Sequence, residues 1–339
     1  MAGPAWPIHP HPLPDELLSS WMIRIARGNG YKVQSFYASY FGRDRQIWNR
    51  DIDHHAPDWL IEALSERTTI RIERIRRMTL RAYEGTVFEE FQDRAVTRFV
   101  MSLSIYHRTH RAFGQQFCPI CLNEDQQPYL RRCWRLALLT VCTKHQVVLQ
   151  DRCGQCGKPV VPHRVDMSTR HSFPARIDMR TCGFCRRRIA AQPEVADGED
   201  VLMQRSLEEV LESGYVSIGN NPNLYAHLYF NGLRAVMHGI RRLGVVTPSH
   251  HNFDCCDVVS RLALMREAAK LLQDWPDHFL RFCDHVRQPY TTFCRDGYLP
   301  YWLYSVMRAN FWQAGASSPT LQSTMKRARS AVVRNSVLT

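Results

Sequence analysis

The chain has 339 residues, of which 45% are hydrophobic and 11% aromatic, enough apolar material for the cores of two or three domains and too much for an intrinsically disordered chain. No run of about 18 apolar residues occurs, and the proline-rich start MAGPAWPIHPHP lacks the features of a secretory signal, so we expect a cytoplasmic protein without membrane contact. The formal net charge of +12 favours an acidic partner such as DNA or RNA.

Residues 1–113 are predicted to form a helical domain. Apolar residues at intervals of three and four predict its first helix, with Asp15 as the N-cap and Gly28 and Gly30 at the end. These apolar residues are Leu17, Leu18, Trp21, Met22, Ile25 and Ala26. A second helix is expected to carry Phe36, Tyr37, Tyr40 and Phe41.

The residues after Pro57 predict a helix-turn-helix. A short helix with Trp59, Leu60, Ala63 and Leu64 is followed by a polar break at residues 65–69 and by a second helix with Ile72, Ile75 and Met78. If these apolar residues face inward, Arg71, Arg74 and Arg77 project outward together, with Arg67 beside them, where they could bind guanine or phosphate. The alternative is an ordinary packed helix pair with a solvated basic face.

Two sets of metal-ligand residues lie in the middle of the chain. Each set joins two C-x2-C or C-x2-H pairs across a spacer of 20 or 25 residues, which is the pattern of a tetrahedral structural zinc site. The sets are Cys118, Cys121, Cys142 and His145, and Cys153, Cys156, Cys182 and Cys185. We therefore predict two structural Zn²⁺ ions in a tandem zinc-binding module at residues 114–190. Disulfides or inert thiols are the alternative, and the spacing leaves open whether the pairs combine sequentially or in a cross-braced order.

Neither set is expected to be catalytic, because four protein ligands leave no open position for water and no H-E-x-x-H or H-x-E signature is present. No Walker loop, dinucleotide fingerprint or nucleophile elbow occurs either. We therefore predict that the protein is not an enzyme.

The zinc region carries most of the positive charge. Between Tyr129 and Ile189 stand 13 Lys or Arg residues and three acids, which is typical of a surface that meets phosphate, although a basic face that only aids solubility is the alternative. The stretch YLRRCWRLALLTVC at residues 129–142 is compatible with a helix, with its Trp and Leu residues in the core and its arginines on the surface. The candidate contact residues here are Arg131, Arg132, Arg135, Arg186, Arg187 and Arg188.

Residues 191–339 are predicted to form a C-terminal helical domain, which makes the whole protein mainly α-helical. The expected helices are residues 201–212, 225–243, 256–273, 276–286 and 302–312. The pair at residues 256–273 and 276–286 could form a second helix-turn-helix.

Two segments resemble the TniQ family of bacterial transposition proteins. They are PHPLPDELLSSWMIRIARGNG at residues 10–30 and FCPICLNEDQQPYLRRCWRLALLTVCTKHQVVLQDRCGQCGKP at residues 117–159. The first matches the family's L-x-x-E/D-x-L-x-S-W start and the second its C-P-x-C-L core. The resemblance extends over about the first 190 residues and carries the eight zinc ligands.

This resemblance implies a target selector that links a chosen DNA site to an AAA+ transposition ATPase of the TnsC or TniB type and to the transposase. In CRISPR-associated transposons such proteins dock on a Cascade-type RNA-guided complex with its guide RNA, in several cases as a homodimer. The implied role is a non-enzymatic adaptor in the bacterial cytoplasm, at the nucleoid. The alternative is an autonomous, zinc-containing, sequence-specific DNA-binding regulator.

Overall fold

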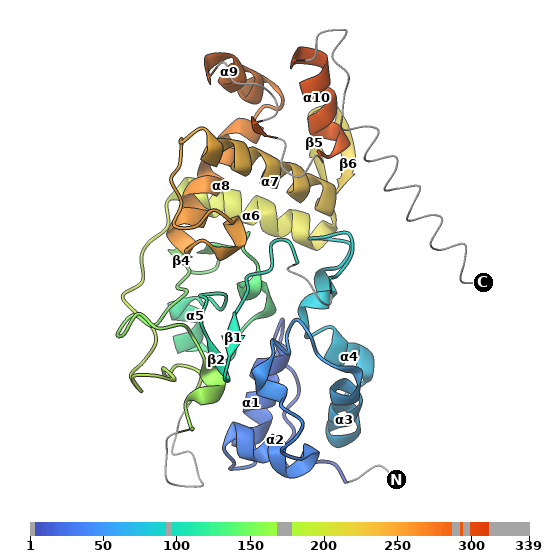
Figure 1. Cartoon of the computed structure of the whole chain (residues 1–339), viewed down its shortest axis with the longest axis vertical. Coiled ribbons are helices and arrows are strands. Elements are labelled where there is room, and N and C mark those ends of the chain that lie inside the picture. The colour runs from blue at the N-terminus through green and yellow to red at the C-terminus, as the bar shows by residue number, and fades with distance from the viewer. Residues whose placement is uncertain (1–3, 93–96, 168–177, 287–291, 294–298, 312–339) are drawn as a thin grey trace, which may run out of the picture. The chain divides into compact units, whose positions relative to one another are not determined.

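The computed structural model describes residues 4–92, 97–167, 178–286, 292–293 and 299–311. In these residues the chain is mainly helical, which confirms this part of the predicted fold class, and its strands pair only as two-stranded antiparallel sheets (Figure 1). The α-helices are α1 (Leu18–Gly28), α2 (Val33–Phe41), α3 (Asp58–Thr68), α4 (Ile72–Arg76), α5 (Pro119–Glu124), α6 (Gly198–Ser213), α7 (Ala226–Arg242), α8 (Val258–Leu272), α9 (Asp277–Val286) and α10 (Tyr301–Phe311). The paired strands are β1 (Ile105–Tyr106) with β2 (Thr109–His110), β3 (Val141–Cys142) with β4 (Val147–Val148), and β5 (Tyr215–Ile218) with β6 (Asn221–Tyr225). None of the described helices is long and apolar enough to cross a lipid bilayer.

By packing, the chain divides into two compact units. The first contains Met1–Glu208 and Ser249–Leu262, and the second contains Glu209–Pro248 and Ala263–Thr339. The N-terminal helices and the cysteine-rich region therefore share one unit. The predicted domains, with boundaries at residues 113 and 190, were defined as segments that fold independently. Packing does not test independent folding, so these boundaries stay a prediction.

Helix α1 keeps the predicted apolar face but begins differently. The six residues of that face are all buried, and Leu17, one of them, occupies the N-cap position without a side-chain cap. The predicted cap by Asp15 is wrong. Instead, the carboxylate of Asp53 accepts hydrogen bonds from the backbone N–H of Ser19, at 2.8 Å, and from its hydroxyl, at 2.7 Å. A cap supplied from 34 residues away cannot be recognised in the local sequence.

Asp15 instead ties the start of the chain to the cysteine-rich region. It has a left-handed backbone with φ of 52°, and its carboxylate accepts from the backbone N–H of Cys133 at 3.0 Å and pairs with Arg132 at 3.0 Å. The backbone N–H of Leu17 donates to the carbonyl of Leu130 at 3.0 Å. These bonds join segments more than a hundred residues apart, so the N-terminal helices pack as part of the first unit.

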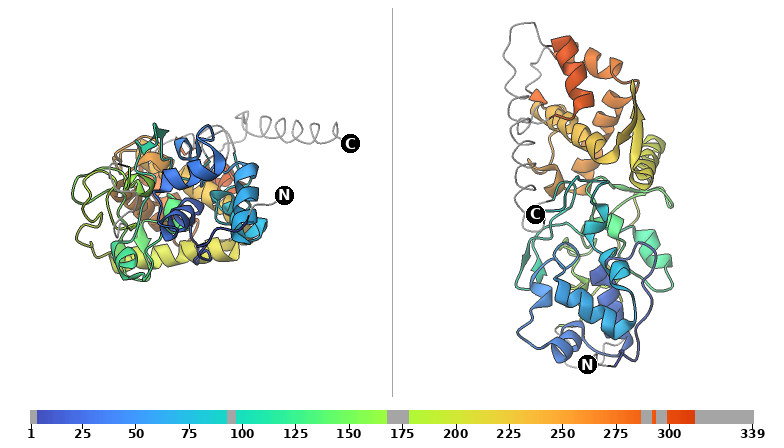
Figure 2. Two further views of the ribbon diagram at one scale, coloured as in Figure 1. Left: turned by 90° about the horizontal axis from the view of Figure 1, so that it is seen from below. Right: turned by 90° about the vertical axis from the view of Figure 1, so that its right-hand side faces the viewer.

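Helices α3 and α4 form the predicted pair, but the second helix is short. Thr69, with φ of 61°, ends α3 in the left-handed conformation, and the chain then turns into α4. Ile75 and Met78 are buried as expected, although Met78 lies beyond the end of α4. Ile72 is only half-buried. A helix of five residues spans only about 7 Å. The helix-turn-helix therefore stays a prediction, although Figures 1 and 2 show the two helices side by side.

The stretch at residues 129–142 is not the α-helix that its composition allows. Only a short 3-10 turn forms, at Arg132–Arg135, and it is followed by a second turn at residues 137–138 and by the short strand β3. Its backbone pairs with a neighbouring segment, because the N–H of Met101 donates to Arg135 and that of Ala137 donates to Phe99, at 3.0 and 2.8 Å. The hydrogen bonds to the segment around Met101, together with the burial of residues 134–139, outweigh the helix preference of the local sequence.

The second unit contains α7, α9, α10 and the β5–β6 hairpin, with parts of α6 and α8. The five predicted helices are present, and the hairpin was not predicted. Two glycines of α7 allow aromatic rings to approach closely: a β-carbon at Gly232 would overlap the ring of Trp302, and one at Gly239 would overlap that of Phe293. The second helix-turn-helix, predicted for α8 and α9, stays a prediction.

Candidate metal centres

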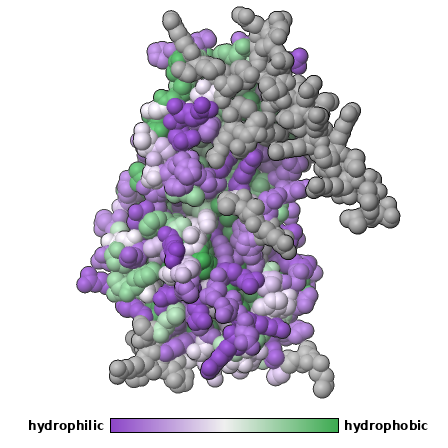
Figure 3. Space-filling model, in the orientation of Figure 1, coloured by the Kyte–Doolittle hydropathy of each residue, from purple (hydrophilic) through white to green (hydrophobic). Residues whose placement is uncertain are grey.

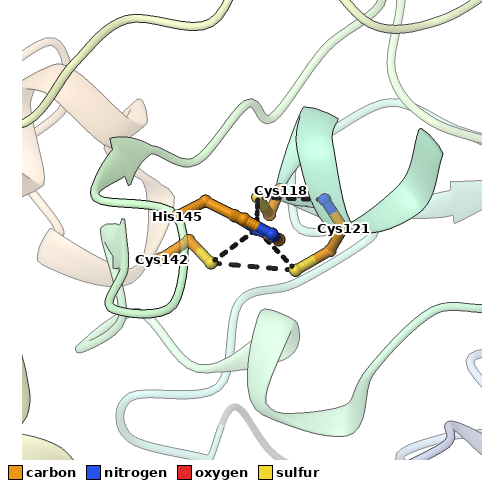
Figure 4. A group of neighbouring side chains, drawn as sticks. All are labelled: Cys118, Cys121, Cys142 and His145. Carbon is orange, nitrogen blue, oxygen red and sulfur yellow. Dashed lines mark hydrogen bonds between the residues drawn. The ribbon is translucent and has the colours of Figure 1, made fainter. Parts of the chain in front are cut away.

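The first set of ligands comes from two short elements of the first unit. Cys118 is the N-cap of α5, and its sulfur accepts a hydrogen bond from the backbone N–H of Cys121 at 3.4 Å, so both thiols lie on one tight turn. Cys142 ends β3, and His145 lies in the turn that leads to β4. Figure 4 shows the four side chains pointing toward a common centre, two from α5 and two from the β3–β4 hairpin.

The distances fit a tetrahedral zinc ion. With a Zn–S bond of about 2.3 Å, two sulfurs at tetrahedral positions lie about 3.8 Å apart, and a sulfur and a nitrogen about 3.5 Å apart. The sulfurs of Cys121 and Cys142 are 3.8 Å apart. Nδ1 of His145 lies 3.5, 3.2 and 3.7 Å from the sulfurs of Cys118, Cys121 and Cys142. The four residues can therefore hold one metal ion.

A carboxylate completes the surroundings of this set. Oε2 of Glu124, at the end of α5, lies 3.0 Å from Nε2 of His145 and 3.7 Å from the amine of Lys144. A ligand histidine usually donates its other ring N–H to such a group, which leaves Nδ1 free to bind the metal. Glu124 was not predicted from the sequence, because one acid three residues after Cys121 carries no recognisable signal.

The second set repeats the same local geometry. The sulfur of Cys153 accepts from the backbone N–H of Gln155 and that of Cys182 from the N–H of Phe184, both at 3.4 Å. Each turn ends in the left-handed region, at Gly157 with φ of 67° and at Arg186 with φ of 65°.

The four sulfurs of the second set are as close together as those of a tetrahedral zinc site. Those of Cys153 and Cys185 are 3.8 Å apart, and those of Cys156 and Cys182 are 3.7 Å apart. The structure thus brings the eight residues together as two sequential sets, and in the described part of the chain these are the two groups able to hold a metal ion.

The thiols in each set perturb one another's ionisation. In the first set, the hydrogen bond with Cys118 raises the pKa of Cys121, while hydrogen bonds from Cys118 and Cys121 lower the pKa of Cys142 to about 2. In the second set, burial raises the pKa of Cys182 to about 12. The thiolate of Cys142 is thus stabilised by its neighbours, whereas ionisation of the other thiols in the same set is unfavourable. A bound cation removes that penalty, as expected for metal ligands.

Arg180, which the sequence analysis did not single out, joins the two sets. Its guanidinium donates to the carbonyls of Leu122, Asn123 and Asp125, at 2.9, 3.1 and 2.7 Å, and pairs with Asp178 at 3.0 Å. These carbonyls stand at the C-terminal end of α5, which has no intrahelical donors for them. Arg180, two residues before Cys182 of the second set, thus anchors the helix that carries Cys121 of the first set.

The arginines predicted to face outward from the helix pair do so in part. Arg71, Arg74 and Arg77 are exposed. Arg67 is half-buried, donates to the carbonyl of Pro4 at 3.0 Å and lies 5.7 Å from the centre of the Tyr40 ring. The exposed side chains of Arg71, Arg74 and Arg77 can reach a partner. That they bind one stays a prediction.

Of the three arginines in the 129–142 stretch, Arg135 contradicts the expectation of a surface position. Its side chain has no exposed area, and it donates to Asp51 at 2.6 Å and to the carbonyl of Met101 at 2.8 Å. Asp53 lies 3.6 Å away. A buried guanidinium needs such compensation, and two nearby aspartates, which the local sequence does not reveal, provide it.

Arg131 and Arg132 are half-buried and already have acidic partners. Arg131 forms two hydrogen bonds of 3.0 Å with the carboxylate of Asp125. It also lies over the rings of Tyr129 and Trp134, at 4.4 and 4.7 Å. Arg132 pairs with Asp15. Both side chains therefore help to hold the first unit together, and a contact with nucleic acid stays a prediction for them.

The arginines next to the second set lie closer to solvent. Arg187 and Arg188 are exposed, and Arg188 donates to the side-chain oxygen of Asn123 at 2.7 Å. Arg186 is half-buried. Their contact with a partner also stays a prediction.

Part of the chain matches a known protein family. Residues 7–149 match the model of the TniQ family. The matched region contains α1 to α5, both strands of the β3–β4 hairpin and all four residues of the first ligand set. No curated protein matches the chain.

Proposed function

We propose, from the chain's membership of the TniQ family of transposition proteins, that it is a non-enzymatic adaptor for target selection. In this role it links target DNA, or a Cascade-type RNA-guided complex on that DNA, to an AAA+ transposition ATPase of the TnsC or TniB type. The ATPase in turn recruits the transposase.

The match over residues 7–149 carries this proposal. The matched helices and the first ligand set pack in one compact unit, so the family region is a continuous body. The second ligand set and the second unit lie outside the match. They are the parts of this chain that could add a further contact to the adaptor.

Both ligand sets are proposed to hold Zn²⁺ as structural ions. The donors are seven thiols and one imidazole, a composition that suits zinc, and their spacing fits the tetrahedral geometry. Each set supplies four protein ligands, which leaves no coordination position for a reacting water. The proposed role of the metal is therefore to hold together loops that contain few regular elements.

The proposed partners require surfaces that can bind acidic groups. Arg71, Arg74 and Arg77 form one such surface on the first unit, since all three side chains are exposed. The face shown in Figure 3 is largely hydrophilic around the helices α1–α4. This surface supports contact with DNA, guide RNA or an acidic region of the ATPase.

Co-purification with the partners tests the proposal. The tagged full chain is mixed with the transposition ATPase, and separately with a Cascade-type complex on its target DNA, and retention of each is measured. We expect both to be retained, and reduced retention of at least one by the triple variant Arg71→Ala, Arg74→Ala and Arg77→Ala. The double variant Arg205→Ala and Arg281→Ala removes exposed arginines elsewhere and is the control. If neither partner is retained, the adaptor role is refuted.

Selection of duplex DNA by the purified chain alone separates this role from the autonomous regulator. The selection is made at roughly 150 mM salt, where non-specific binding is weakened. Weak binding without sequence preference is expected for an adaptor with borrowed targeting. A single enriched sequence, bound tightly by the chain without partners, would favour the regulator.

A further inference from the structure

A cavity of about 450 Å³ lies in the first unit, outside the metal centres. It is formed by α2, the following loop, the 3-10 turn Ile47–Asn49 and the tip of the β1–β2 hairpin. Its polar lining includes Gln34, Arg43, Arg45 and Arg108. None of these residues was identified as a candidate from the sequence, because they come from two segments more than 60 residues apart.

Three guanidinium groups give this cavity a strong positive charge. Among the described residues, no aspartate or glutamate lines it. Arg108 donates to the neutral side-chain oxygen of Gln34 at 2.8 Å, and Arg45 lies 4.5 Å from the centre of the Trp59 ring. All three arginines are exposed, and none forms an ion pair with a carboxylate in the described part of the chain. Their charges are therefore oriented by neutral neighbours and remain available to an anion.

Trp48 forms part of the wall of the cavity. Its side chain is buried, and its indole N–H has no acceptor among the described residues, although buried donors are usually paired. The guanidiniums are therefore the donors that the cavity offers, and an anion with several oxygens could bind them together.

The backbone holds Arg108 at the rim under strain. The β1–β2 turn has two residues, and both, His107 and Arg108, have left-handed backbones with φ of 45° and 61°. Such turns favour asparagine and glycine, so two larger residues are strained at these positions. The turn is held by hydrogen bonds to the carbonyl of Arg108, from Nε2 of His163 at 3.0 Å and from Arg164 at 3.3 Å. Strain that the surroundings maintain in this way is typical of functional positions.

An exposed aromatic ring lies next to this turn. Tyr106, two residues before Arg108, is 51% exposed. The guanidinium of Arg111 lies 3.8 Å from the centre of its ring, and the ring of His107 lies 4.1 Å away. An exposed ring flanked by a cation is a platform on which an unpaired base can stack.

We propose that this cavity binds a backbone phosphate of a single-stranded nucleic acid and that an adjacent base stacks on Tyr106. The inference rests on the proposed function, since it names the part of the nucleic-acid target that the chain itself contacts. An acidic peptide would satisfy the three guanidiniums equally well but has no base for the exposed ring. A duplex keeps its bases stacked inside, so it offers only phosphate.

Binding of labelled oligonucleotides to the full chain tests this proposal. The probes are a DNA and an RNA single strand of about 16 nucleotides and a duplex of the same sequence. This length is the upper limit of the site size of one single-strand-binding OB fold. Anisotropy is measured over a series of salt concentrations. We expect tighter binding of at least one single strand than of the duplex, and the better of the two strands identifies the natural ligand as DNA or RNA.

The variants separate the phosphate contact from the stacking contact. Arg108→Ala should weaken single-strand binding roughly 10-fold, because a charge-assisted hydrogen bond is lost, and should lower the salt slope by about 0.7. Tyr106→Ala should weaken binding by about 5-fold or more at an unchanged salt slope, and Tyr106→Phe should restore it. Arg205→Ala, which removes an exposed arginine on α6, is the matched control and should leave single-strand binding near the wild-type value.

The proposal is overturned if Arg108→Ala and Tyr106→Ala bind single strands as the wild type does. It is also overturned if a poly-glutamate peptide displaces the oligonucleotide as effectively as unlabelled single strand, because the surface would then serve an acidic protein. Retention of neither the ATPase nor the Cascade-type complex in the co-purification would refute the adaptor role and leave the oligonucleotide result untouched. Oligonucleotide binding uses no ATPase, so the two failures can be told apart.

Discussion

Replacing Arg135 by methionine should destabilise the first unit strongly. The guanidinium has no exposed area and compensates two carboxylates, the half-buried Asp51 at 2.6 Å and the buried Asp53 at 3.6 Å. Arg135→Met keeps most of the volume but removes the charge and the hydrogen bonds. Asp53 also caps α1 through Ser19, so the damage should extend to that helix.

The magnitude follows from the cost of leaving a buried charge without its partner. Removing one member of a buried ion pair costs about 3–5 kcal/mol, most of which is the penalty for the remaining charge. Neutralising the acids as well should recover much of this loss. We therefore expect the triple variant Arg135→Met, Asp51→Asn and Asp53→Asn to be more stable than Arg135→Met alone.

The two carboxyls also give the single variant a characteristic pH dependence. In the wild type, burial opposes ionisation of Asp51, but Arg135 lowers its pKa, whereas burial and the charge of Asp51 raise the pKa of Asp53 to about 6. Without Arg135, the pKa values of both Asp51 and Asp53 in the folded state should rise above the pKa of an aspartate in the unfolded chain. The folded state then binds more protons, so stability falls as pH rises and the deficit of Arg135→Met should be smaller at pH 5 than at pH 7.

Amide hydrogen exchange in α1, together with the urea midpoint, measures this effect without requiring the whole chain to unfold in one step. Arg135→Met should lose protection in α1 at pH 7 and regain part of it at pH 5. Wild-type protection at pH 7, or a triple variant no better than the single one, would refute the reasoning.

Three further predictions concern the metal centres and a buried histidine. Cys142→Ser and Cys182→Ser should each reduce the zinc content from two ions per chain and give poorly soluble protein, because zinc contributes roughly 10 kcal/mol or more to small modules; normal solubility and melting of both variants would exclude structural sites. Glu124→Ala should weaken zinc binding in a chelator competition by about 10- to 100-fold, with Glu124→Gln in between, and unchanged affinity would contradict its role toward His145. Burial lowers the pKa of His110 to about 3, so the unfolded state takes up its proton first and stability falls as pH drops below about 6.5. His110→Gln should show a slope shallower by up to about 1.4 kcal/mol per pH unit in unfolding between pH 6.5 and 5, and identical slopes would show that this histidine is not buried in its neutral form.

The sequence by itself predicted the features that depend on local spacing. The helical periodicity located α1, α2, α3 and the five C-terminal helices, because an amphipathic face repeats every three to four residues whatever surrounds it. The C-x2-C spacing predicted the eight residues that the structure brings together as two groups able to hold a metal ion, because two donors on one tight turn point the same way. The match of residues 7–149 to the TniQ family agrees with the resemblance seen in the motifs.

Only the tertiary structure decided how distant segments complete one another. It replaced Asp15 by Asp53 as the cap of α1, buried Arg135 beside two aspartates and divided an apparently helical stretch into turns and a short strand. It also placed Glu124 beside His145 and brought Arg43, Arg45 and Arg108 to one cavity. Charges and unpaired backbone groups are satisfied by whatever lies close in space, and that partner is often a hundred residues away in the chain.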